Sequence, residues 1–274
     1  MNYKIVASDL DGTLFNNAKE VSPENISAID RMTELGVSFV PCSGRTLREI
    51  PENVKEIPSV RYIIHSDGAV VYDKATGERI EACMSGDVAK PALDILFDYA
   101  NSMTVRYKGE SYVNAAEHNT EYYTHHRVEA FYQKMIFDVC RPMWDYKRFC
   151  YGLDGIEMIC IHFHSQEDLE ECKARLEAVD GISVTRLEEQ SIEVYDKRAG
   201  KGNGLCRLAD HLGCTYEETI AVGDSGNDID MLRKAGLSLV MSNGLDIAKA
   251  EANAIICSNE EHGAKYILEN YIEK

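Results

Sequence analysis

Residues 5–14 read IVASDLDGTL, and this stretch decides the fold. Its first four residues are small or apolar and continue the run that starts at Tyr3, which predicts a buried strand ending at Ser8. Asp9 and Asp11 follow at once, and Gly12 lets the chain turn sharply because it has no Cβ. Open parallel sheets bind ligands at the carboxyl ends of their strands. The two carboxylates therefore mark a candidate site.

Similar short apolar runs alternate with amphipathic segments near both ends of the chain. This alternation is typical of parallel strands joined by helices, so we predict an α/β fold with a Rossmann-like, doubly wound parallel sheet. Ser22 and Pro23 predict the start of the first helix, and Gly36 its end. The predicted strands are Tyr3–Ser8, Val37–Pro41, Tyr62–His65, Thr219–Val222, Leu237–Met241 and Ala254–Cys257.

The middle of the chain differs in texture from its ends. It has longer β segments, at residues 103–107, 111–115, 157–164 and 182–187, and a helical pattern at 165–179. We therefore predict two domains: a core made of residues 1–83 and 191–274, and an inserted α+β cap made of residues 84–190.

Composition limits the class of partner. The formal net charge is -17 and no long Lys/Arg run occurs, so nucleic acid and anionic membranes are disfavoured and a small molecule is expected. Nine scattered cysteines without a CxxC pair indicate a reducing compartment. With neither a leader sequence nor a membrane-length apolar run, we expect a cytoplasmic protein, either a monomer or a homodimer.

A second acidic segment, residues 223–228 (GDSGND), follows a predicted strand near the other end of the chain. Its carboxylates should reach the same sheet edge as Asp9. Carboxylate and carbonyl oxygens suit Mg²⁺, which usually takes only one or two protein carboxylates. We expect the side chains of Asp9 and Asp224 and the carbonyl of Asp11 to be its ligands.

Competing motifs fail on spacing. A calcium loop needs glycine at its sixth position, and neither Asp9 nor Asp224 is followed by one there. A nucleotide P-loop around Lys201 would need glycine at position 195 and Ser or Thr at position 202, but the chain has Tyr195 and Gly202 there. A dinucleotide-binding fingerprint that starts at Gly200 would need glycine or alanine at position 205, where the chain has Leu205.

Four segments in order, residues 9–13 (DLDGT), 43–45 (SGR), Lys201 and 223–228, resemble the motifs of haloacid dehalogenase superfamily phosphatases. The insertion between the second and third motifs resembles the type 2 cap of the Cof-like subfamily. The resemblance implies a Mg²⁺-dependent phosphatase that forms an aspartyl phosphate and hydrolyses small phosphate monoesters, with sugar phosphates the expected class.

The same resemblance implies a role for each matching residue. Asp9 would be the nucleophile, and Asp11 the general acid and base, which requires a high pKa. The phosphate would be bound by Leu10, Ser43, Gly44, Arg45, Lys201 and Asn227. The metal would be bound or supported by Asp9, Asp11, Asp224 and Asp228.

Several features leave alternatives open. One alternative function is that of a phosphomutase, which would need a second phosphate site, and the candidates for it are Arg106, Arg127, Arg141 and Arg148. Another alternative is a catalytically silent phosphate-binding or regulatory module. Asp67 stands where the subfamily usually has Asn, and we interpret it as a turn residue rather than a reader of a substrate hydroxyl.

Two clusters in the insertion carry no assigned role. His162 and His164 share a predicted strand face but lack an acidic or Cys partner for a metal. The aromatic residues around 122–144 are interpreted as cap core or interface.

Overall fold

A computed structural model describes residues 3–274 of the chain, apart from the side chains of residues 187 and 188. The chain divides into two compact units. The first extends to Arg45 and continues with Ile50–Glu81 and Gly200–Lys274. The second consists of Thr46–Glu49 and Ala82–Ala199.

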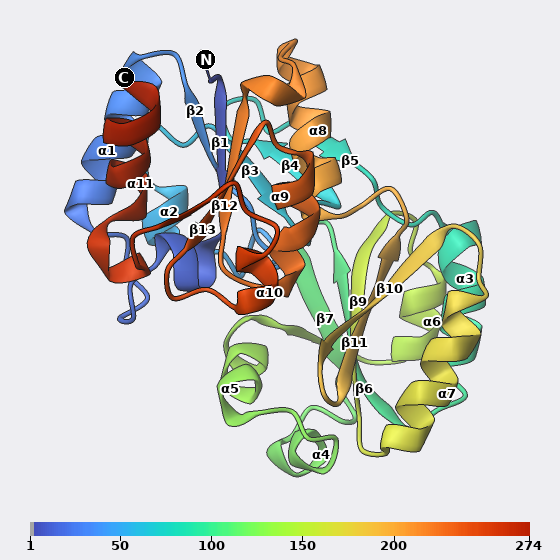
Figure 1. The fold of residues 1–274 in the computed structure, drawn as a ribbon. Helices are drawn as coiled ribbons and strands as arrows, with labels where there is room; N and C mark the ends of the chain where they lie inside the picture. The colour runs from blue at the N-terminus through green and yellow to red at the C-terminus, as the bar shows by residue number, and fades with distance from the viewer. Residues whose placement is uncertain (1–2) are drawn as a thin grey trace. The chain divides into compact units, whose positions relative to one another are not determined.

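The first unit is built on a five-stranded parallel sheet in the order β14-β13-β12-β1-β2 (Figure 1). Every residue of β1 is buried, which explains why its sequence is a continuous run without polar alternation. The strands are β1 (Ile5–Ser8), β2 (Ser38–Pro41), β12 (Thr219–Gly223), β13 (Leu237–Met241) and β14 (Ala254–Ile256). The predicted Rossmann-like fold class is confirmed.

Helices cover both faces of this sheet. Figure 1 shows α1 (Pro23–Glu34) and α11 (Gly263–Ile267) on one side, with α8 (Lys201–Leu212) and α9 (Ile229–Lys234) on the other. The start of α1 is as predicted, because the Ser22 hydroxyl accepts a hydrogen bond from the amide of Asn25. Two further short helices are α2 (Glu52–Lys55) and α10 (Asp246–Lys249).

One predicted strand joins a different sheet. Residues 62–65 form β3 (Tyr62–His65), but β3 pairs antiparallel with β4 (Val70–Asp73), which pairs with β5 (Arg79–Glu81). A single bridge, Cys42 to Ile64, runs parallel toward β2. The link between β3 and β4 is too short for the crossover that a parallel pair requires, so the chain forms a hairpin.

The second unit is a six-stranded mixed sheet in the order β10-β11-β9-β6-β7-β8, with five helices. Its strands are β6 (Asn101–Tyr107), β7 (Glu110–Asn114), β8 (Arg141–Met143), β9 (Ile156–Phe163), β10 (Ile182–Glu188) and β11 (Ser191–Asp196). Its helices are α3 (Gly86–Leu96), α4 (Thr120–His125), α5 (Ala130–Val139), α6 (Tyr146–Tyr151) and α7 (Gln166–Glu177). One hydrophobic cluster joins β9 and β11 to α3, α6 and α7.

The second unit is larger than the predicted cap. Strand β11 lies beyond the predicted boundary at residue 190, yet it pairs with β9 and β10. Residues 46–49 also belong to this unit, because the hydroxyl of Ser111 donates to Glu49 at 2.6 Å and the amide of Arg48 donates to the carbonyl of Gly109 at 3.0 Å. Pairing partners far along the chain decided both boundaries.

Across residues 3–274, none of the helices combines the length and the apolar character needed to cross a bilayer.

Gly68 and Gly77 allow a matched test of the close approach between Gly68 and the backbone of Gly200. Both have φ of +76°, but a Cβ on Gly68 would overlap the carbonyl oxygen of Gly200, whereas a Cβ on Gly77 would meet nothing within 4 Å. Gly77→Ala should therefore lower the free energy of unfolding by about 1 kcal/mol through backbone strain alone. Gly68→Ala should lower it by about 3 kcal/mol or more, because overlap adds to strain. Urea denaturation measures both, and equal losses would contradict the packing of Gly68 on Gly200.

Candidate active site

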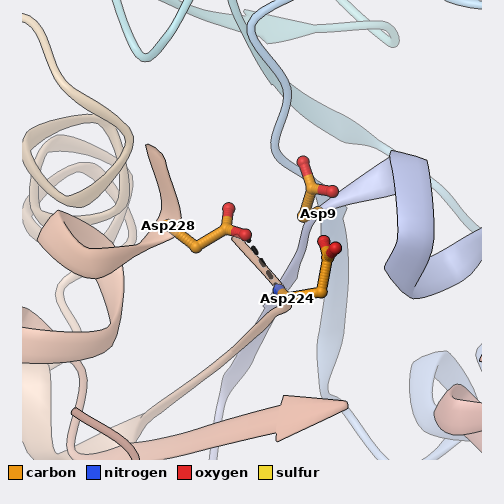
Figure 2. Close-up of side chains that lie close together, drawn as sticks. All are labelled: Asp9, Asp224 and Asp228. Carbon is orange, nitrogen blue, oxygen red and sulfur yellow. Dashed lines mark hydrogen bonds between the residues drawn. The ribbon is translucent and has the colours of Figure 1, made fainter. Parts of the chain in front are cut away.

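Three carboxylates from distant parts of the sequence meet at the carboxyl edge of the parallel sheet. Asp9 follows β1, Asp224 follows β12, and Asp228 lies one short turn later. Each offers an oxygen, and these oxygens all lie within 4.8 Å of one another. Figure 2 shows the three side chains gathered at one point, with Asp228 bound to the backbone of Asp224. The predicted convergence of Asp9 and Asp224 is confirmed.

Lys201 connects two of these carboxylates. Its Nζ lies 2.6 Å from Asp9 Oδ1 and 2.7 Å from Asp228 Oδ1, and its side chain is fully buried. Burial alone would lower the pKa of Lys201, but Asp228 and Asp9 raise it well above its ordinary value. The lysine therefore remains an ammonium and supplies one fixed positive charge to the cluster.

Two glycines allow the acidic groups to approach this closely. A Cβ on Gly12, where φ is +83°, would lie 2.5 Å from Asp224 Oδ2. A Cβ on Gly223 would overlap the carboxyl group of Asp228. Any larger residue at either position would push a carboxylate out of place, which is the physical reason for glycine in both motifs.

Asp228 has a supporting position. Its Oδ2 accepts hydrogen bonds from the amides of Asp224 and Ser225 at 2.9 and 3.0 Å, while Oδ1 faces Lys201. A fully buried carboxylate with this set of donors is held rigidly. It thereby fixes the backbone that carries Asp224.

Asp9 and Asp224 have too few neighbouring cations to balance the negative charge of the cluster. Burial raises the pKa of Asp9 to about 8, although Lys201 opposes the rise. Burial also raises the pKa of Asp224 to about 6, and the charge of Asp228 adds to that rise. Three carboxylates and one ammonium leave a formal charge of -2. A divalent cation beside the oxygens of Asp9 and Asp224 would balance this charge, so the donor set fits such an ion.

The ion pairs and the pKa of Asp11 differ from the sequence-based expectation. Arg45 donates to both of its oxygens, from Nε at 2.9 Å and Nη2 at 3.1 Å, and Lys19 Nζ lies 2.9 Å from Oδ1. Burial alone would raise the pKa of Asp11, but these hydrogen bonds lower it below its ordinary value. The expected high pKa is therefore wrong for this structure, because two cations that sequence reasoning did not pair with Asp11 bind it. Arg45, expected to bind phosphate, binds Asp11 in this structure, and its contact with a phosphate stays a prediction.

Ser43 and Gly44 lie in the loop after β2. Ser43 is buried, and its hydroxyl accepts a hydrogen bond from the amide of Arg45 at 3.2 Å. The neighbouring turn holds this loop, since the amide of Asp67 donates to the carbonyl of Ser43 at 3.1 Å and the carbonyl of Asp67 accepts from the amide of Gly200 at 2.7 Å. Asp67 has φ of +46°, in keeping with its interpretation as a turn residue. The turn joins the Ser43 loop to the start of α8.

The remaining expected phosphate ligands lie differently. Leu10 has a buried side chain, and its carbonyl accepts a hydrogen bond from the amide of Phe15, so only its backbone could serve a ligand. Asn227 is exposed and accepts a hydrogen bond from the Ser225 hydroxyl. Thr13 was given no role in advance, yet its hydroxyl donates to Asp224 Oδ1 at 3.1 Å. Its place in the Asp-Gly-Thr string was the available signal.

His162 and His164 of the second unit have different surroundings. His164 Nδ1 contacts the carbonyl of His125 at 2.7 Å, and burial lowers the pKa of His162 to about 4. Within residues 3–274, the acidic cluster of Asp9, Asp224 and Asp228 is the one group with three converging metal-ligand atoms.

Comparison with known proteins identifies the class. A family model for haloacid dehalogenase-like hydrolases matches residues 6–268. The chain belongs to that family, which confirms the resemblance seen in its motifs.

The similarity to individual proteins extends over the whole chain. Phosphatase YwpJ of Bacillus subtilis is 26% identical, with 98% of this chain and 100% of the relative covered. The 5-amino-6-(5-phospho-D-ribitylamino)uracil phosphatase YwtE of the same organism is also 26% identical, with 98% of each covered. A haloacid dehalogenase-like hydrolase from Bacteroides thetaiotaomicron has a similar structure, with a TM-score of 0.80, 25% identity, and 98% and 99% of the two chains covered.

The raised pKa of Asp224 predicts a pH effect on stability. A carboxyl group whose pKa rises from 3.8 to about 6 on folding stabilises the fold below its unfolded pKa, and that contribution is lost as pH rises through 6. Without divalent ions, wild-type stability should therefore fall relative to Asp224→Asn between about pH 4 and about pH 6, in urea titrations. Added Mg²⁺ should raise the melting temperature more at about pH 8 than at about pH 5, because the ion needs ionised ligands. A pH-independent difference between the two proteins would contradict the burial of this carboxylate.

Proposed function

We propose that this chain is a Mg²⁺-dependent phosphatase that hydrolyses small phosphate monoesters through a phosphoryl intermediate on Asp9. The observation that carries the proposal is the buried contact of Lys201 with Asp9 beside Asp224 and Asp228. A carboxylate that faces a phosphate dianion at ~4 Å meets about 4 kcal/mol of repulsion per charge pair at an effective dielectric near 20. A nucleophilic Asp9 therefore needs fixed cations, and Lys201 is one.

In the first step, a carboxylate oxygen of Asp9 attacks the phosphorus atom and the bond to the ester oxygen breaks. Lys201 offsets the charge that Asp9 and the phosphate bring together. The hydroxyl of Ser43 and nearby backbone amides would hold the phosphoryl oxygens. Asp11, when protonated, donates its proton to the leaving alkoxide.

In the second step, water attacks the phosphorus atom of the aspartyl phosphate and the bond to Asp9 breaks. The proton of the water goes to Asp11, and the electron pair returns to the carboxylate of Asp9. Because Asp11 is held as an ionised carboxylate by Arg45 and Lys19, it already has the form needed for this step. For the first step it must give up at least part of that pairing.

The metal proposal rests on the charge balance of the site. The side chains of Asp9 and Asp224 and the carbonyl of Asp11 would hold Mg²⁺, with Asp228 as support. When bound, the ion supplies positive charge against the phosphate oxygens. Asp228 also orients Asp224 through the amide hydrogen bond of 2.9 Å.

The proposed substrate is a phosphorylated sugar or sugar alcohol. Two arguments support this class: the resemblance to Cof-like sugar phosphatases, and the relative YwtE, whose name records a ribityl phosphate as its substrate. The acidic net charge of the chain and its scattered thiols fit a small-molecule enzyme of the cytoplasm.

Hydrolysis is favoured over phosphoryl transfer to a second hydroxyl. A phosphomutase needs cations for its second phosphate, and two of the four candidate arginines already pair with acids: Arg141 Nη2 lies 2.9 Å from Glu110 and Arg106 Nη2 lies 3.5 Å from Glu49. These carboxylates would compete with a second phosphate. A catalytically silent module is disfavoured because Asp9 and Asp224 already converge.

Replacement of Asp9 tests the nucleophile. Asp9→Asn keeps the shape of the side chain but lacks an anionic oxygen, so phosphate release from p-nitrophenyl phosphate and sugar phosphates should fall below detection in Mg²⁺ buffer. Asp180→Asn is the control, since that acid is exposed and its carboxylate pairs with Lys197 on the surface. Turnover retained in Asp9→Asn would refute the proposed intermediate.

Replacement of Asp11 tests proton transfer. Asp11→Asn can neither donate nor accept the proton, so kcat/KM for an alkyl phosphate should fall about 10²-fold or more. For p-nitrophenyl phosphate, whose leaving group needs no proton, kcat/KM should fall much less. An equal fold-loss of kcat/KM for both substrates would show that Asp11 does not protonate the leaving group.

A further inference from the structure

A lysine outside the four sequence motifs reaches the carboxylate of Asp11. Lys19 lies in the loop between the first acidic motif and α1, and its Nζ is 2.9 Å from Asp11 Oδ1. Arg45 binds the same carboxylate from the loop after β2, with Nε on Oδ2 and Nη2 on Oδ1. Two cations from separate loops therefore fix both oxygens of Asp11.

The backbone at Lys19 adopts a conformation that side chains disfavour. Its φ is +61°, in the left-handed region where glycine is the usual residue. The turn is closed by the amide of Lys19 donating to the carbonyl of Asn16 at 2.9 Å and by the amide of Asn16 donating to Glu20 at 3.0 Å. Non-glycine residues held in this way gather at functional sites.

The loop is also fixed from the C-terminal segment of the chain. The Asn259 amide group donates to the carbonyl of Phe15 at 3.0 Å, and Glu260 Oε1 accepts from the amide of Asn17 at 2.5 Å. The start of the Lys19 side chain is therefore placed by its surroundings, and little loop ordering is needed to bring its ammonium to Asp11.

Stability does not account for a lysine at this position. The side chains of Lys19 and Asp11 are 54% and 38% exposed, and an ion pair of that exposure contributes only about 0–1 kcal/mol. Glycine would form the same turn without the strain of a positive φ. The contact that sets this lysine apart is the one that its ammonium makes with Asp11.

We propose that Lys19 is a positioning residue that, with Arg45, orients the carboxylate of Asp11 toward the water that hydrolyses the phosphoryl enzyme. This inference rests on the proposed function. In that step the water oxygen bonds to phosphorus, the bond to Asp9 breaks, and the released proton moves to Asp11. A carboxylate held at both oxygens keeps one orientation, and loss of orientation by about 1 Å can cost up to about 10²-fold in rate.

With p-nitrophenyl phosphate the first step needs no proton from Asp11, so a change in Lys19 should slow only the second step. In Lys19→Gly, kcat should fall about 10-fold, KM should fall with it, and kcat/KM should stay within about twofold of wild type. Phosphoryl enzyme should accumulate, which stopped-flow detects as a burst of p-nitrophenol.

Two further variants separate positioning from folding. Lys19→Arg keeps a cation and should recover most of the wild-type kcat. Lys108→Gly is the matched control for stability, because Lys108 is an exposed lysine with φ of +51°. Neither glycine variant should lower the melting temperature, since glycine suits a positive φ.

The outcomes distinguish the two levels of proposal. An unchanged kcat in Lys19→Gly would overturn the positioning role, and so would a raised KM with unchanged kcat, which would mark Lys19 as a phosphate ligand. A melting temperature lowered in Lys19→Gly but not in Lys108→Gly would assign Lys19 a structural role instead. Wild-type protein that releases no phosphate with Mg²⁺ would refute the proposed function itself.

Discussion

The site depends on one buried ion pair network, in which Lys201 lies between Asp9 and Asp228. An ammonium without exposed surface is tolerated only when carboxylates surround it, because an unpaired charge in the interior costs several kcal/mol. The same network keeps two carboxylates close together. Because their two negative charges exceed the single positive charge of the lysine, the cluster favours a further cation beside it.

Glycine positions and backbone hydrogen bonds make this network possible. Asp228 is fixed by the amides of Asp224 and Ser225, and Gly223 leaves space for its carboxyl group. Gly12 does the same for Asp224. A second set of contacts, centred on the turn at Asp67, ties the Ser43 loop to the start of α8. The acidic groups are therefore placed by rigid backbone, and Lys201 offsets part of their mutual repulsion.

Much of the fold followed from local patterns. The strand at residues 5–8 was predictable because a fully buried parallel strand is a continuous apolar run. The start of α1 was predictable because Ser22 caps it. Patterns of this kind do not name pairing partners, so Tyr62–His65 was found as a strand but assigned to the wrong sheet. The place of β11 and residues 46–49 in the second unit likewise depends on partners distant in the chain.

The sequence by itself determined the chemistry available at the site, since motif order and strand ends sufficed to bring Asp9, Asp224, Asp228 and Lys201 together on one edge. Only the tertiary structure decided the state of Asp11. Its pKa depends on Arg45 and Lys19, which reach it from two separate loops, and side-chain ion pairs of this kind leave no periodic trace in a sequence. Residue types fix which charges exist, whereas the distances between them, set by packing, fix how those charges behave.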